Sequence, residues 1–132
     1  MRKSFLIWAA ILGASATALG AWGAHSLPQL VDEIQANSFK TGTTYQFYYT
    51  LALLAVVLVH AQLKNKFFVY AGYAFIVGIL MFSGSIYLLS TKTLSGIAFP
   101  SIMGLITPFG GLTMILGWVF FLVGAMQYKK QI

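Results

Sequence analysis

Long apolar stretches, broken by short polar joints, dominate the pattern along the chain. A helix needs roughly 20 residues to cross the hydrocarbon core of a bilayer, which is about 30 Å thick. Four stretches are long enough, at about 5–24, 45–63, 67–90 and 105–128. The run LALLAVVLV is apolar on every face, whereas the strands of a membrane barrel alternate apolar and polar residues. The pattern therefore predicts an all-α, polytopic membrane protein: a bundle of four transmembrane helices that forms a single membrane domain over 1–132.

The joint after the first span, 25–44, is the most polar part of the chain. Apolar residues recur in it at helical spacing, at Leu27, Leu30, Val31 and Ile34. Ser26 and Gln29 match a capping box, and Pro28 falls where a first helical turn tolerates proline. These features predict a short amphipathic helix at the membrane surface after the first span.

The other joints constrain how the spans connect. Spans two and three are separated by Lys64-Asn65-Lys66 alone, which predicts a tight antiparallel hairpin. The joint 91–104 is apolar for a loop, so we expect it to lie in the interface or against the bundle. Pro108 fits the first turn of span four. The first span resembles a signal peptide, but its apolar run is longer than such peptides have, and we expect it to be retained.

Small residues recur at packing distances along three of the spans. Lipid provides no hydrophobic reason for helices to associate, so membrane helices pack through such residues. The stripes are Ala9, Gly13, Thr17 and Ala21 in span one; Ala71, Ala74, Gly78 and Ser85 in span three; and Gly110, Gly117 and Gly124 in span four. They predict seams at which the helices pack against one another. The same seams could bind other membrane proteins or a second copy of the chain. Span two lacks glycine and is rich in Leu and Val, so we expect it to face lipid more than the others.

Charged residues make up only 8% of the chain and lie in the joints and termini. One side of the predicted membrane carries six basic residues: Arg2, Lys3, Lys64, Lys66, Lys129 and Lys130. The other side carries two basic residues and both acids: Lys40, Lys92, Asp32 and Glu33. The positive-inside rule then predicts that both termini are cytoplasmic. The net charge of +6 is thus explained by orientation, and we expect no nucleic-acid partner because no basic surface interleaved with aromatics is present.

The predicted spans contain no charged residue. Proton relays, voltage sensors and carriers of charged substrates keep such residues at membrane depth. The chain has no Cys and only two His, His25 and His60, which the predicted topology separates by roughly the thickness of the membrane. We therefore expect no enzyme activity, no catalytic residues, no metal site and no cofactor.

Aromatic and hydroxyl side chains form the best candidate functional surface. The candidates are Trp22, His25, Tyr45, Tyr48, Tyr49, Ser83, Ser85 and Thr107. The first five are expected to gather at the outer end of spans one and two, and the three hydroxyls would be uncharged polar contacts inside apolar spans. The alternative is an ordinary interfacial belt of aromatics, with hydroxyls bonded within or between helices.

Four ordered motifs resemble those of the domain of unknown function 423 family. They are GAWGAH at 20–25, FKTG followed by YQFY at 39–48, FSGSIY at 82–87, and ITPFGG at 106–111 followed by Gly117-Trp118. The resemblance covers nearly the whole chain. It implies a small, multi-pass, four-helix protein of the bacterial inner (plasma) membrane, and it implies no reaction because the family's biochemical function is not established.

Two kinds of function are compatible with these features. The first is a non-enzymatic accessory, assembly or lipid-organising bundle, which acts through its helix faces on the lipid bilayer and on other membrane proteins. The second is a carrier or pore for a small uncharged or lipid-like solute, formed by a monomer or by an oligomer, with the Tyr-rich end as its mouth. A continuous polar cavity would favour the second function, and a close-packed interior the first.

Overall fold

Four long helices make up the protein. The computed structural model describes residues 2–130, apart from the side chain of Arg2, so residues 1, 131 and 132 of the predicted domain lie outside the described part. The long helices are α1 (Arg2–His25), α2 (Glu33–Leu63), α3 (Lys66–Ser90) and α5 (Met103–Met126). The connections contain a 3₁₀ turn, η1 (Leu27–Gln29), and a single-turn helix, α4 (Lys92–Ser95). All four long helices can cross a membrane by length and hydropathy, which confirms the predicted all-α, four-helix fold.

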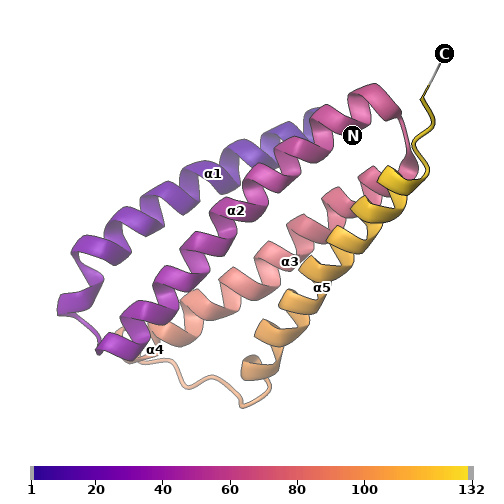
Figure 1. Cartoon of the computed structure of the whole chain (residues 1–132). Coiled ribbons are helices and arrows are strands. Elements are labelled where there is room, and N and C mark those ends of the chain that lie inside the picture. The colour runs from indigo at the N-terminus through magenta and orange to yellow at the C-terminus, as the bar shows by residue number, and fades with distance from the viewer. Residues whose placement is uncertain (1, 131–132) are drawn as a thin grey trace.

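The helices run up and down and pack in chain order (Figure 1). Helix α1 lies along α2, α2 along α3, and α3 along α5. The start of α1 and the end of α5 lie at the same end of the bundle as the α2–α3 connection, and we call this the Lys64 end. The opposite end, where α1 ends and α2 begins, is the His25 end.

The α2–α3 connection is the tight hairpin that its length predicts. Lys64 has a positive φ of 53°, and its N–H donates to the carbonyl of His60. Asn65 then caps α3, since its Oδ1 accepts from the N–H of Phe67 at 2.9 Å. The Nδ2 of Asn65 also donates to Oε1 of Gln127 at 2.9 Å, and this bond ties the hairpin to the end of α5.

The start of α2 corrects the sequence prediction. Asp32 has an extended backbone, and its Oδ1 accepts from the N–H of Gln35 at 2.8 Å, so α2 begins twelve residues before the predicted start of span two. In place of the short amphipathic helix stands the three-residue turn η1, where Ser26 makes no side-chain cap and Leu27 is fully buried. Asp32 is the stronger cap, and Ile34 belongs to α2.

Aromatic rings seated on glycines fill the Lys64 end of the bundle. A Cβ on Gly72 would overlap the ring of Phe5, and a Cβ on Gly117 would lie 2.6 Å from the ring of Phe75. Gly124 likewise faces the ring of Phe68, at 3.0 Å. The seams predicted on spans three and four are therefore confirmed as buried packing faces, and these contacts lie inside the single bundle.

The predictions for spans one and two need correction. The buried stripe of α1 consists of Phe5, Ala9, Leu12 and Ala16, whereas Thr17 and Ala21 of the predicted seam are exposed. The prediction that span two faces lipid most is wrong. A third of its most apolar window is buried, against 22% in each of α1 and α5, because α2 lies between α1 and α3.

Helix α5 begins two residues earlier than predicted, at Met103. Pro108 consequently lies in the second turn, inside the helix, and not at its start. Because proline has no N–H, the carbonyl of Gly104 lacks the usual helical donor at this point.

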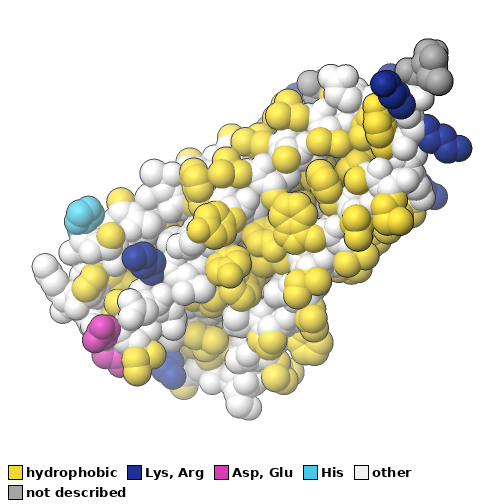
Figure 2. Space-filling view, viewed as in Figure 1, with side chains coloured by type: hydrophobic (Ala, Val, Ile, Leu, Met, Phe, Trp, Pro, Cys, Tyr) yellow, Lys and Arg dark blue, Asp and Glu magenta, His cyan; other side chains and the backbone are white. Residues whose placement is uncertain are grey.

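The surface separates charge from apolar side chains (Figure 2). Lys side chains gather at the Lys64 end, both acids lie at the opposite end beside two further Lys side chains, and hydrophobic side chains cover the face between the two ends. This distribution is typical of a bundle that spans a bilayer.

Candidate functional site

The three clustered tyrosines lie in the middle of α2, away from the outer end of the bundle predicted from the sequence. Tyr45 follows the start of α2 by twelve residues, a rise of about 18 Å. Trp22 and His25 lie in the last turn of α1, at the His25 end. The expected gathering of all five residues at one end is therefore wrong, because the earlier start of α2 shifts the tyrosines toward the centre of the bundle.

Trp22 and His25 have different surroundings. The ring of Trp22 packs edge-on against Phe39 at 5.5 Å, and Phe39 in turn contacts the ring of Tyr87 at 4.9 Å. Gly23 makes this possible, since a Cβ there would lie 2.7 Å from the Phe39 ring. The side chain of His25 is exposed.

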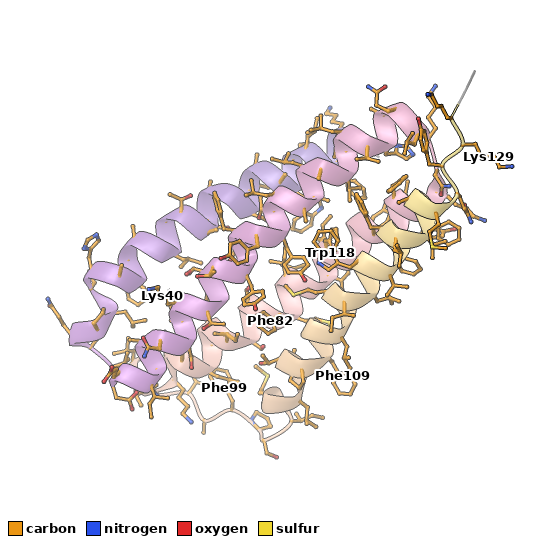
Figure 3. The ribbon with its side chains drawn as sticks, in the orientation of Figure 1. Lys40, Phe82, Phe99, Phe109, Trp118 and Lys129 are labelled. Atoms are coloured by element: carbon orange, nitrogen blue, oxygen red, sulfur yellow. The ribbon has the colours of Figure 1, made fainter. Side chains whose placement is uncertain are left out.

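The tyrosines contact α3 and α5. Tyr49 packs its ring against Phe75 at 5.2 Å, and its hydroxyl accepts from Nε1 of Trp118 at 3.0 Å. Tyr45 packs against Phe82 at 5.3 Å and against Tyr48 at 5.9 Å. Figure 3 shows Phe82 and Trp118 between α2 and the α3–α5 pair.

The three predicted hydroxyls bind across helix interfaces. Ser83 is buried and donates to the carbonyl of Gly42 at 2.7 Å, which joins α3 to α2. Ser85 and Thr107 share a hydrogen bond of 2.5 Å, which joins α3 to α5. The structure thus places these residues in helix contacts, and it does not bring them into hydrogen-bond contact with the tyrosines.

A buried amide outside the predicted candidate residues joins three helices near the middle of the bundle. Gln46 is 3% exposed. Its Nε2 donates to the carbonyl of Leu12 at 2.8 Å and to Oγ of Ser15 at 2.7 Å. Its Oε1 accepts from the hydroxyl of Tyr87 at 2.5 Å. One side chain of α2 therefore binds both α1 and α3.

A signal for Gln46 exists in the sequence. Gly42, Gln46 and Thr50 recur at four-residue steps and thus share one face of α2. All three are buried, and a Cβ on Gly42 would lie 2.8 Å from the ring of Tyr87. A search of the predicted spans for charged residues misses Gln46, because its side-chain amide is neutral.

Buried polar side chains are unevenly distributed along the bundle. They are Thr43, Gln46, Thr50, Ser83, Ser85 and Ser90. All six come from the first eighteen residues of α2 or the last eight of α3, the segments that lead to the His25 end. Within residues 2–130, no buried side-chain nitrogen or oxygen lacks a hydrogen-bond partner. The buried polar side chains in this part of the bundle are therefore satisfied by hydrogen bonds within the chain.

Several hollows lie around these buried polar residues. One, of about 380 Å³, lies between α1 and α2 and is lined by Gly20, Gly23, Lys40 and Thr43 among others. Another, of about 530 Å³, lies between α3 and the start of α5. Its lining is Leu80, Met81, Gly84, Ser85, Tyr87, Leu88, Met103 and Ile106. Among the described residues, no three His, Asp or Glu side chains are placed to hold a metal ion.

Comparison with known protein families assigns the chain to one of them. Residues 19–111 match the family described as a protein of unknown function, DUF423. The chain belongs to the DUF423 family. It is 35% identical over 129 residues to the UPF0382 inner membrane protein YgdD of Escherichia coli strain K12, which covers 98% of this chain and 94% of the relative. It is 36% identical over 127 residues to the UPF0382 membrane protein YwdK of Bacillus subtilis, which covers 96% and 98% respectively.

Membership in DUF423 confirms the resemblance seen in the four motifs. A membrane protein of Haemophilus influenzae is similar over the same extent, with 34% identity across 98% of this chain. No solved structure matches the chain. Together with the four spanning helices, these relatives identify a multi-pass protein of the bacterial inner (plasma) membrane, and their names state no reaction.

Proposed function

We propose that this DUF423 protein is a non-enzymatic, lipid-organising bundle that acts through its lateral helix faces. The observation that carries the proposal is the closed network around Gln46. A carrier needs polar groups free to meet a solute, whereas here the amide of Gln46 and the hydroxyl of Ser83 are bound to neighbouring helices. The hydroxyls also lack the base that a nucleophile needs, since Ser83 binds a carbonyl and Ser85 binds Thr107.

The hollow between α3 and α5 supports a lipid as the ligand. Most of its lining residues are apolar, and two of them, Leu80 and Leu88, are exposed on the surface of α3. Gly84 leaves space there, since a Cβ added to it would meet nothing within 4 Å. A volume of about 530 Å³ is within the range of small-molecule sites and accommodates a segment of an acyl chain.

The test measures retained lipid. The full chain is purified in a mild detergent or in nanodiscs and analysed by native mass spectrometry, with a vesicle extract of phosphatidylethanolamine and phosphatidylglycerol as the lipid source. Gly84→Leu fills the hollow and should lower the retained lipid several-fold. Ala10→Leu adds similar bulk to an exposed position of α1 and should leave retention unchanged.

Two results would count against the proposal. A wild-type chain that carries no lipid under these conditions removes the evidence for a lipid ligand. Equal retention by the wild type and Gly84→Leu shows that the lipid binds elsewhere than the α3–α5 hollow.

A further inference from the structure

The tyrosines of α2 lie near the middle of the membrane-spanning bundle. Tyr48 is the sixteenth of the 31 residues of α2. A Cβ on Gly13, at the centre of α1, would lie 3.5 Å from the side chain of Thr50, so this level of α2 coincides with the middle of α1. Tyrosine normally occupies the membrane–water interface, where its hydroxyl meets water and headgroups. Tyr45 and Tyr48 therefore lie at an unusual depth.

Their hydroxyls also lack partners inside the described chain. The Tyr49 hydroxyl is bonded to Trp118, and that of Tyr87 to Gln46, whereas the hydrogen bonds among residues 2–130 include none for Tyr45 or Tyr48. Tyr45 is 41% exposed and Tyr48 is 59% exposed. The hydrocarbon core offers no water to satisfy these groups. A partner with hydrogen-bonding groups at the same depth would satisfy them.

We propose that a second copy of this chain covers this surface, which we call the tyrosine face: Tyr45, Tyr48, Tyr49 and Trp118. A tyrosine hydroxyl both donates and accepts, so the face is complementary to itself. Two copies inserted in the same orientation can be related by a twofold axis only along the membrane normal, and that axis brings equal depths together. Tyr48 then meets Tyr48 of the second copy, or its Tyr45.

The internal packing supports this choice of face. The glycine seams that could otherwise draw helices together are occupied within the bundle: Gly72 by Phe5, Gly117 by Phe75, and Gly124 by Phe68. The tyrosine face is open on the side of α2 and α5 shown in Figure 3, where Trp118 is 46% exposed. This inference rests on the proposed action through lateral faces, but it uses a different face from the α3–α5 hollow.

The experiment uses cysteine cross-linking, which suits a chain without cysteine. Ala55 is exposed and lies two helical turns beyond Tyr48 on the same side of α2. Ala55→Cys in lipid vesicles, oxidised at a series of protein-to-lipid ratios, should give a disulfide-linked dimer. Ile11 is also exposed, and it lies next to Leu12, whose carbonyl binds Gln46, so it is at a similar depth but on α1. Ile11→Cys should therefore remain monomeric.

The hydroxyls are tested in the Ala55→Cys background. Tyr48→Phe keeps the ring and should weaken association about threefold, the effect of one interhelical hydrogen bond in a membrane. Tyr70→Phe makes the same change at an exposed position of α3 and should have no effect. A monomer at every ratio, equal cross-linking by Ala55→Cys and Ile11→Cys, or no effect of Tyr48→Phe would each overturn the proposal. Loss of dimer with lipid retention intact would leave the proposed lipid function standing.

Discussion

The side-chain amide of Gln46 accepts a hydrogen bond from the hydroxyl of Tyr87, at 2.5 Å, while its nitrogen donates to the carbonyl of Leu12 at 2.8 Å. Three helices thus meet at one buried side chain. In a membrane, helix association relies on close packing and on such interhelical bonds. The Gln46 network is therefore the polar counterpart of the glycine-seated rings at the Lys64 end.

Replacing Gln46 with leucine should destabilise the bundle. The change removes bonds to Leu12, Ser15 and Tyr87, and at the average for interhelical bonds in membranes the loss is about 2 kcal/mol. Steric-trap unfolding in bicelles measures it. Gln62→Leu is the matched control, since Gln62 is exposed at the other end of α2.

A double mutant separates the bond from the packing. Tyr87→Phe alone leaves the amide oxygen of Gln46 without its partner, whereas Gln46→Leu with Tyr87→Phe removes both groups. The double variant should therefore lose less free energy of unfolding than the sum of the single losses. Strict additivity would show that the two residues do not interact in the membrane.

Gly110 should tolerate no larger residue. A Cβ there would overlap the backbone nitrogen of Phe82 and lie 2.8 Å from its Cα, and a backbone cannot move aside without separating α3 from α5. Gly110→Ala should cost about 1–3 kcal/mol of unfolding free energy. Gly84→Ala is the control, because nothing lies within 4 Å of its added Cβ, and it should cause no loss. Equal stability of the two variants would contradict the close approach of α3 and α5.

The sequence was sufficient to predict the number, type and order of the membrane helices. Hydropathy and length locate α1, α3 and α5 to within three residues at each end, because apolar residues are continuous there. The start of α2 could not be located in this way. Its first turns carry polar residues such as Asn37 and Lys40, which end the apolar run although the helix continues, capped by Asp32.

The candidate site was less predictable because it depends on depth and rotation. An error of twelve residues in the start of α2 moved the tyrosines from the middle of the bundle to its outer end. The bonds of Ser83 and Gln46 depend on which helix faces which, and hydropathy does not determine this. The pairing of Gly23 with Phe39 likewise joins residues that no local pattern relates.

Ser85 and Thr107 should be coupled energetically. Their hydrogen bond of 2.5 Å joins α3 to α5 one residue before Pro108, where the helix lacks a main-chain donor. Ser85→Ala, Thr107→Val and the double variant form a cycle, and its coupling should be about 0.6 kcal/mol, the average for such pairs. A coupling of zero would show that the bond does not hold the start of α5.

Both termini should lie in the cytoplasm, as the charge distribution predicts. Lys130→Cys should react with a membrane-impermeant maleimide only after the cells are opened, and Gln29→Cys should react in intact cells, since both positions are exposed. The reverse pattern would contradict the prediction.

A charge variant is the control for this orientation. Replacing four lysines with Gln would leave two basic residues on each side of the membrane; the four are Lys64, Lys66, Lys129 and Lys130. Without a charge difference both orientations should form, so Gln29→Cys in this background should react only partly in intact cells. Changing Lys40 and Lys92 to Gln instead should leave its labelling complete, because six basic residues then oppose none. Complete labelling of Gln29→Cys in both backgrounds would show that these lysines do not determine the orientation.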